Sequence, residues 1–183
     1  MLMNRAQRKP LLAITRAYKT TSYEKLFMVT GVISFELEAI KKKMMREKSR
    51  ELERRLTREE IGEIDEVLRW ENAKNFTKKL NVEMRIEFRN DICPELVYVL
   101  TGHGPFRAFL NKIGRAEETE CRLCGEEEES VRHFQEGCEA LEFRIAETVA
   151  SDKELSELIE NSRRLVRRLR EMEQPVRTDV LRV

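Results

Sequence analysis

The chain has 183 residues, 38% of them charged and 40% hydrophobic, and its formal net charge is only +1. This charged fraction exceeds the roughly 25% of ordinary soluble domains, and 7 glycines and 4 prolines are too few for a protein of many short strands. No apolar run is long enough to span a membrane and no hydrophobic leader follows Met1, so we expect an intracellular protein, in the nucleus or cytoplasm. The composition predicts an all-α fold of several amphipathic helices.

The first part of the chain predicts a series of helices with recognisable start signals. Apolar positions from residue 11 to 17 favour a helix whose start is left open by Pro10. Residues 21–24, Thr-Ser-Tyr-Glu, fit a capping box with Thr21 as the first residue, and Gly31 is placed to end that helix. A longer helix with a solvated middle is predicted from residue 34 to 56, and a second capping box at residues 57–60 starts the next one.

The middle of the chain predicts one strand and a helical hairpin. Residues 82–91 alternate apolar and charged side chains, a period of two that indicates a strand, although the sequence offers it no partner. Pro94 suits the first turn of a helix through Leu100, and another helix is predicted from about residue 105 to 112, ending at Gly114. We expect this hairpin to lead directly into a loop that contains cysteines.

Two further helices are predicted near the C-terminus. The first runs through Leu141, Phe143 and Ile145, and the second begins at Ser151 or Asp152. The second carries an apolar stripe at a and d spacing that is interrupted by Ser162, and we expect this stripe to pack on the chain's own core. The stripe consists of Leu155, Leu158, Leu165, Leu169 and Met172. The predicted regions are 1–93 (helical), 94–150 (hairpin and metal loop) and 151–183 (amphipathic helix and tail).

The metal-site motif is C-x2-C-x8-H-x4-C, formed by Cys121, Cys124, His133 and Cys138. Two cysteines separated by two residues can both turn inward on a tight loop, which Gly125 lets the chain leave. The histidine and the last cysteine would close a tetrahedral site from a second short element. We predict one structural zinc ion with four protein ligands. The alternative is that reduced cysteines merely cluster in a polar loop.

Two other reactive side chains have simpler interpretations. His103 lies in Gly-His-Gly-Pro without an evident catalytic partner, so we expect a turn or packing role. Cys93 has no second cysteine at ligand spacing and is expected to be a small buried residue.

The charges are unevenly distributed along the chain. The first 25 residues are basic, the segment around the cysteines is acidic and includes Glu126 to Glu129, and a second basic group follows Asn161. Because carboxylates repel phosphate, we expect a polyanion to bind at the two ends rather than at the metal loop. For the second group the alternative is a solvated helix face. The expected nucleic-acid contacts are Arg5, Arg8, Lys9, Arg16, Lys19, Arg163, Arg164, Arg167 and Arg168.

Two segments resemble a known family. AQRKPLLAITRAYKTTS (residues 6–22), together with GVISFELE (31–38), resembles the region downstream of the polymerase domain in arthropod non-LTR (LINE-type) retrotransposon reverse transcriptases. LTGHGPFRAFLNKIG and AEETECRLCGEEEESVRHFQEGC, between residues 100 and 138, are similar to the C-terminal end of the same polyproteins, with their CCHC zinc knuckle. Residues 70–94 depart from the family, which usually has a tryptophan-rich segment there.

The resemblance implies a parent protein with polymerase and endonuclease domains, but this sequence contains little of that machinery. The family's polymerase site uses a Tyr-x-Asp-Asp turn, and no Asp-Asp pair occurs here. An endonuclease after the knuckle would need more chain than residues 139–183. We therefore expect a non-catalytic C-terminal fragment that binds RNA or DNA and no membrane, rather than an active polymerase.

A hypothesis from another class is a protein-interaction module. In it, zinc only stiffens the scaffold, and the C-terminal leucine stripe binds a partner helix or mediates self-association.

Overall fold

The structure of the protein is a computed structural model that describes residues 2–76, 80–84 and 92–173. Its described residues are mainly helical, which confirms the expected fold class. The helices are α1 Leu2–Thr15, α2 Tyr23–Thr30, α3 Phe35–Glu51, α4 Arg58–Phe76, α5 Pro94–Thr101, α6 Arg107–Lys112, α7 Val131–Glu136 and α8 Asp152–Glu171; the strands are β1 Glu83–Met84 and β2 Thr148–Val149.

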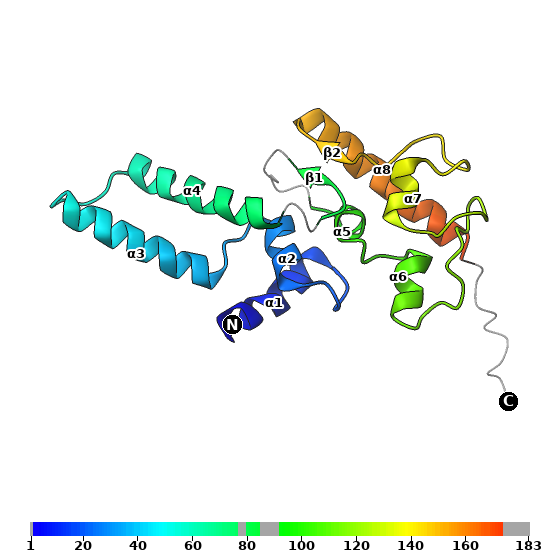
Figure 1. The fold of residues 1–183 in the computed structure, drawn as a ribbon, viewed down its shortest axis with the longest axis horizontal. Helices are drawn as coiled ribbons and strands as arrows, with labels where there is room; N and C mark the ends of the chain where they lie inside the picture. Colours follow the sequence, from blue (N-terminus) through cyan, green and yellow to red (C-terminus); the bar gives the residue numbers. More distant parts are fainter. Residues whose placement is uncertain (1, 77–79, 85–91, 174–183) are drawn as a thin grey trace.

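Figure 1 shows the arrangement of these elements. The α3–α4 hairpin extends away from the molecule, α1 and α2 lie at its base, and α5 to α8 form the opposite part. None of the described helices combines the length and the apolar character that a membrane span requires.

The N-terminal helices resolve one open point and correct one detail. The start of the first helix, which the sequence left open, is Leu2, and Pro10 lies inside α1. The N-cap of α2 is Ser22, whose hydroxyl accepts a hydrogen bond from the Lys25 amide, so the prediction of Thr21 as the cap is wrong by one residue. Thr21 is buried, and its hydroxyl instead contacts Nδ1 of His103 at 3.4 Å. Gly31 ends α2 in the left-handed conformation (φ 63°), as predicted.

The α3–α4 hairpin is held by caps and ion pairs. α3 ends at Glu51, earlier than the predicted residue 56, and none of its residues is buried, which confirms a solvated helix. The second capping box is confirmed, because the Thr57 amide donates to Glu60 Oε2 at 2.7 Å and the Glu60 amide donates to Thr57 Oγ1 at 3.2 Å. Lys41 Nζ and Asp65 Oδ1, 2.6 Å apart, join the two helices.

The predicted strand has a partner that the sequence did not reveal. β1 pairs in parallel with β2, with Glu83 opposite Thr148 and Met84 opposite Val149. The rest of the predicted strand, residues 85–91, lies outside the described residues. Val149 of β2 and Val82, directly before β1, are both fully buried. The strand pair therefore links the middle of the chain to the segment before α8.

The helix predicted through Leu141, Phe143 and Ile145 does not form. The chain there has turns and extended backbone, and the Ile145 amide donates to the Phe134 carbonyl at 3.0 Å. The physical reason is the spacing, because apolar residues two positions apart share one face of an extended chain and not of a helix.

The main core lies between α5 and α8. Ser151 caps α8, as one of the two predicted alternatives, and accepts a hydrogen bond from the Glu154 amide. The stripe residues Leu155, Leu158, Leu165 and Leu169 are buried in the same cluster as Leu96, Val97 and Leu100 of α5. This confirms that the stripe packs on the chain's own core, whereas Met172 at its end is 52% exposed.

Candidate functional site

Cys121 and Cys124 lie on a tight hairpin loop. Glu120 and Glu128 pair as an antiparallel bridge at its base, and the Cys121 amide donates to the Glu127 carbonyl at 2.7 Å. The Gly125 amide donates to the Cys121 carbonyl at 2.8 Å, and Gly125 has φ 77°, a conformation that favours glycine. The loop therefore turns both thiols to the same side, with Gly125 in the role predicted from the sequence.

His133 and Cys138 come from α7 and the residues after it. Ser130 caps α7 by accepting a hydrogen bond from the His133 amide at 3.3 Å. At the other end the Gly137 amide donates to the His133 carbonyl at 3.0 Å, and Gly137 has φ 116°. This turn brings Cys138 back beside His133, which is the second short element that the spacing predicted.

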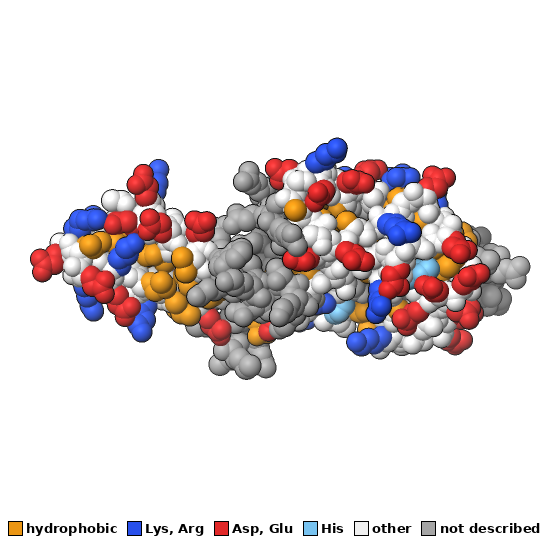
Figure 2. All heavy atoms as spheres, turned by 45° about the horizontal axis from the view of Figure 1, so that its top comes forward, with side chains coloured by type: hydrophobic (Ala, Val, Ile, Leu, Met, Phe, Trp, Pro, Cys, Tyr) orange, Lys and Arg blue, Asp and Glu red, His pale blue; other side chains and the backbone are white. Residues whose placement is uncertain are grey.

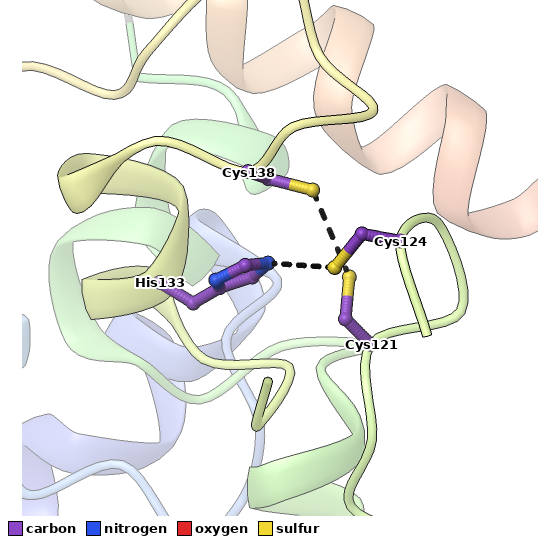
Figure 3. A group of neighbouring side chains, drawn as sticks. All are labelled: Cys121, Cys124, His133 and Cys138. Atoms are coloured by element: carbon purple, nitrogen blue, oxygen red, sulfur yellow. Dashed lines mark hydrogen bonds between the residues drawn. The ribbon is translucent and has the colours of Figure 1, made fainter. Parts of the chain in front are cut away.

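The four side chains converge, as Figure 3 shows, and could hold a metal ion. Their ligand atoms all lie within 4.8 Å of one another. Cys124 Sγ is 3.4 Å from His133 Nε2, and Cys121 Sγ is 3.9 Å from Cys138 Sγ. Around a tetrahedral Zn²⁺, bonds of about 2.3 Å to sulfur and about 2.0 Å to nitrogen place sulfur atoms about 3.8 Å apart and sulfur and nitrogen about 3.5 Å apart. The two measured separations are close to these values.

A carboxylate fixes the orientation of the histidine ring. Glu127 Oε2 lies 2.7 Å from His133 Nδ1, so Nδ1 carries the proton and Nε2 is left free to face the thiols. A hydrogen bond of this kind is common behind metal-binding histidines, where it sets the tautomer and strengthens the ligand. No feature of the sequence distinguished Glu127 from its acidic neighbours.

Burial and backbone hydrogen bonds shift the pKa values of the three thiols in different directions. Loss of hydration raises the pKa of the Cys138 thiol to about 12 and also raises the pKa of Cys121. Cys124 differs, because a hydrogen bond from the Glu126 backbone amide lowers its pKa to about 7. A divalent cation bound among these groups would stabilise the thiolates that burial disfavours.

Glu129 is a structural residue that the sequence did not reveal. Its carboxylate is fully buried and lies 2.6 Å from Nη2 of Arg122, a side chain that is only 6% exposed. It also accepts hydrogen bonds from the backbone amides of Arg107 (2.8 Å) and Arg122 (3.0 Å). Arg122 in turn donates to the carbonyl oxygens of Pro105 and Leu169. This pair, the Arg122–Glu129 clamp, connects the metal loop to α6 and to the end of α8.

His103 and Cys93 have the packing roles expected of them. The His103 ring stacks on Phe109 with centroids 4.7 Å apart, and its Nδ1 lies 3.3 Å from Thr20 Oγ1. Burial lowers the pKa of His103 to about 4, helped by the positive charges of Lys25 and Lys112. Cys93 is buried, 8% exposed, directly before α5.

The basic residues predicted near the N-terminus have different environments. The Arg8 guanidinium donates to the carbonyl oxygens of Lys19 and Thr21, so it holds the loop after α1. Lys9 is exposed on α1, and the side chain of Arg5 lies outside the described part of the chain. Arg16 and Lys19 are exposed, and they line a groove with residues of the turn after α6.

The α8 arginines face two directions. The Arg164 guanidinium lies 4.5 Å from the Phe143 ring centroid, and Arg168 Nη1 donates to the Ala140 carbonyl at 3.1 Å. These two residues therefore anchor α8 to the segment after Cys138. Arg163 and Arg167 are exposed, and with Arg170 they line a second groove.

Comparisons with known proteins are consistent with this picture. No family model and no solved structure matches the chain. One curated protein is similar to it, the "Retrovirus-related Pol polyprotein from type-1 retrotransposable element R1" of Bradysia coprophila, with 27% identity over 75% of this chain. The chain spans 16% of the length of that relative. The similarity confirms that this chain resembles a region of a non-LTR retrotransposon polyprotein.

Proposed function

We propose that the chain is a non-catalytic, zinc-stabilised region of a retrotransposon polyprotein that binds nucleic acid. The observation that carries this proposal is the convergence of three thiols and one imidazole on one point, from two elements of the chain. Burial raises the pKa of Cys121 and of Cys138, so in the absence of a cation these two thiols would stay protonated, and metal binding would have to displace their protons.

Zinc is the metal that best fits these donors. Sulfur and nitrogen ligands in a tetrahedral set favour Zn²⁺ over Mg²⁺ or Ca²⁺, which prefer oxygen ligands. Four protein ligands would fill the coordination sphere and leave no position for a reactive water. We therefore assign the metal a structural role, in which it ties α7 and the residue after it to the Cys121–Cys124 loop.

The binding part of the proposal rests on charge and on the relative. Exposed cations occur at the end of α1 and on α8, separated in sequence by the acidic metal loop. The similar Bradysia coprophila protein is, by its name, a polyprotein of a retrotransposable element, whose cycle passes through RNA and DNA. The non-catalytic part rests on the sequence, which has no Asp-Asp pair.

The metal assignment is tested by measuring zinc per chain in wild type, Cys124→Ser and Cys93→Ser. We expect one zinc in wild type and in Cys93→Ser, and less than one in Cys124→Ser. Of these two cysteines, only Cys124 contributes a ligand atom to the cluster. Chelation should also reduce the helical circular dichroism of wild type. Equal zinc content in both variants would contradict the assignment.

The other two parts need separate measurements. Binding of labelled RNA and single-stranded DNA at about 50 mM salt should weaken steeply as the salt concentration rises, because bound phosphates release counterions. A primer-extension assay with Mg²⁺ should show no synthesis. No affinity for either nucleic acid at low salt would exclude the binding function, and synthesis would exclude the non-catalytic one.

A further inference from the structure

We propose that single-stranded nucleic acid binds to one composite surface made from the two ends of the described chain. We define this basic surface by six exposed cations that line two grooves: Arg16, Lys19, Arg115, Arg163, Arg167 and Arg170. The inference rests on the nucleic-acid binding proposed above and specifies where on the molecule that binding occurs.

The first part of the basic surface lies at the end of α1. Residues 16–20 and the turn after α6 line a groove with a volume of about 510 Å³. Arg16 and Lys19 come from one side, and Arg115 comes from the other. Arg16 has φ 51°, a turn conformation that ends α1 and directs the following residues across the molecule.

The second part lies on α8. Arg163, Arg167 and Arg170 occur at positions i, i+4 and i+7, so they share one helix face. They line a groove of about 480 Å³ together with Glu95 and Glu171. Arg170 Nη1 and Glu95 Oε1 form a long ion pair of 4.0 Å in which the arginine is 57% exposed, so this pair is weak and leaves the cation accessible.

Two tyrosines link the elements that line the grooves, because Tyr18 lines the first groove and Tyr98 lies one turn after Glu95, which lines the second, on α5. The rings of Tyr18 and Tyr98 meet edge to face with centroids 5.6 Å apart, and Tyr18 also contacts Phe109 at 5.1 Å. Burial is the main cause that raises the pKa of each tyrosine, and the positive charge of Arg170 lowers the pKa of both. Arg115 also lowers the pKa of Tyr18 and Arg16 that of Tyr98, whereas Glu173 and Glu95 raise them, so charges of both signs act on the aromatic pair.

This combination fits a single strand better than other polyanions. Cations in a groove follow the phosphate backbone, and a partly exposed aromatic ring offers a stacking position for a base. Tyr18 is half-buried, so its packed side fixes the ring while the other side can meet a ligand. The carboxylates of Glu95, Glu171 and Glu173 would oppose any polyanion here, but the six cations of the basic surface outnumber them.

The test compares two charge-reversal pairs with the same helical spacing. Arg163→Glu/Arg167→Glu changes the basic surface, whereas Arg46→Glu/Arg50→Glu changes exposed arginines of α3, far along the hairpin. Binding of a labelled 20-nucleotide RNA, and of single-stranded DNA of the same sequence, is measured by fluorescence anisotropy at several salt concentrations. Zinc content and circular dichroism confirm that each variant is folded.

We expect the α8 variant to bind at least tenfold more weakly and to show a shallower dependence of log K on log salt, by about 0.7 for each lost phosphate contact. Arg16→Glu/Arg115→Glu should show the same loss, because it alters the other groove. The α3 variant should bind nearly as wild type.

Other outcomes separate this inference from the proposed function. If wild type binds and the α8 and α3 variants are weakened equally, the basic surface is wrong although nucleic-acid binding stands. If wild type binds neither RNA nor DNA, both proposals fail. Anionic vesicles that bind wild type more tightly than either nucleic acid, with loss in the α8 variant, would assign the surface to a membrane and overturn the inference.

Discussion

Neutralising Glu129 gives a direct test of the Arg122–Glu129 clamp. In Glu129→Gln the side chain keeps its size, but one carboxylate oxygen becomes an amide that donates hydrogen bonds. The oxygens of Glu129 accept from two backbone amides and from the Arg122 guanidinium, so the new amide would face donors instead of acceptors. The Arg122 charge would then be buried without its main partner.

The expected loss follows from the burial of both groups. Removing one member of a buried ion pair costs about 3–5 kcal/mol, because the other charge has lost its hydration. We expect Glu129→Gln to lower the free energy of unfolding by about 3 kcal/mol, at the lower end of this range, because glutamine keeps one acceptor oxygen. Arg122 also contacts Glu173 at 3.1 Å, but Glu173 is 54% exposed, and a surface pair offsets at most about 1 kcal/mol. The unfolding equilibrium constant should therefore rise about a hundredfold.

The matched control is Glu126→Gln, which removes one carboxylate from the same acidic run at an exposed position. Both variants are unfolded with urea in the Co²⁺-loaded form, because the absorbance of the thiolate–Co²⁺ complex reports on this part of the molecule. The free energies of unfolding are compared by linear extrapolation. Glu126→Gln should differ from wild type by less than about 0.5 kcal/mol.

The result that refutes the reasoning is a similar loss in the two variants. If Glu129→Gln lowered the free energy of unfolding by no more than Glu126→Gln does, Arg122 would have to be hydrated, and the clamp would not connect the metal loop to α6 and α8. A large loss in both variants would instead indicate that the whole acidic run, rather than the buried carboxylate, supports this region.

Three further predictions concern single side chains. Glu127→Gln should weaken metal affinity about tenfold in a chelator competition, because a neutral amide oxygen accepts from His133 Nδ1 more weakly than the carboxylate does, whereas Glu128→Gln should leave the affinity unchanged. His103 has a pKa lowered to about 4 when folded, so it stabilises the fold fully above its ordinary pKa of 6.5 and loses that contribution as the pH falls toward 4. His103→Asn should therefore show a smaller loss of stability than wild type over this pH range, and an identical loss would contradict the assignment. Ser151→Ala should lower the free energy of unfolding by about 1 kcal/mol in thermal or urea unfolding, because the first turn of α8 loses its cap, and an unchanged value would refute this role.

The metal site was predictable because its information is local. The spacing of the cysteines and the histidine, with Gly125 after the second cysteine, describes two short turns that face each other. The structure brings those four side chains together in this way. The zinc itself stays a prediction, since the convergence of ligands does not identify the metal.

The acidic run shows what a sequence pattern leaves undetermined. All four glutamates were assigned one property, repulsion of phosphate, but Glu127 contacts His133 and Glu129 is buried against Arg122. Which glutamate points inward depends on the register of the hairpin, which is fixed by the Glu120–Glu128 bridge. Identical residue types at consecutive positions carry no signal of that register.

Errors in the predicted elements have a similar origin. Thr21 and Ser22 are both good helix caps, and the choice between them was decided by burial of Thr21 beside His103, a contact across more than 80 positions. The partner of β1 was likewise distant in sequence. Local propensity cannot rank alternatives that tertiary contacts decide.

The nucleic-acid hypothesis requires the arginine face of α8 to be exposed, whereas the protein-interaction hypothesis requires its leucine stripe to be exposed. The packing of α8 distinguishes the two. A partner helix would need the leucine stripe, but that face is already buried against the core shared with α5. Among the described residues, the uncovered hydrophobic side chains of the hairpin, such as Phe35 and Ile40, offer a more accessible apolar face (Figure 2).

Burial of the stripe also has a consequence for the opposite face of α8. With the leucines inward, and with Arg164 and Arg168 tied to the segment after Cys138, the remaining arginines must point outward at fixed positions. The metal loop reaches the same helix through Arg122 and the Leu169 carbonyl. By holding α8, the metal loop would fix the orientation of Arg163 and Arg167 and so support the nucleic-acid binding proposed above, without itself contacting nucleic acid.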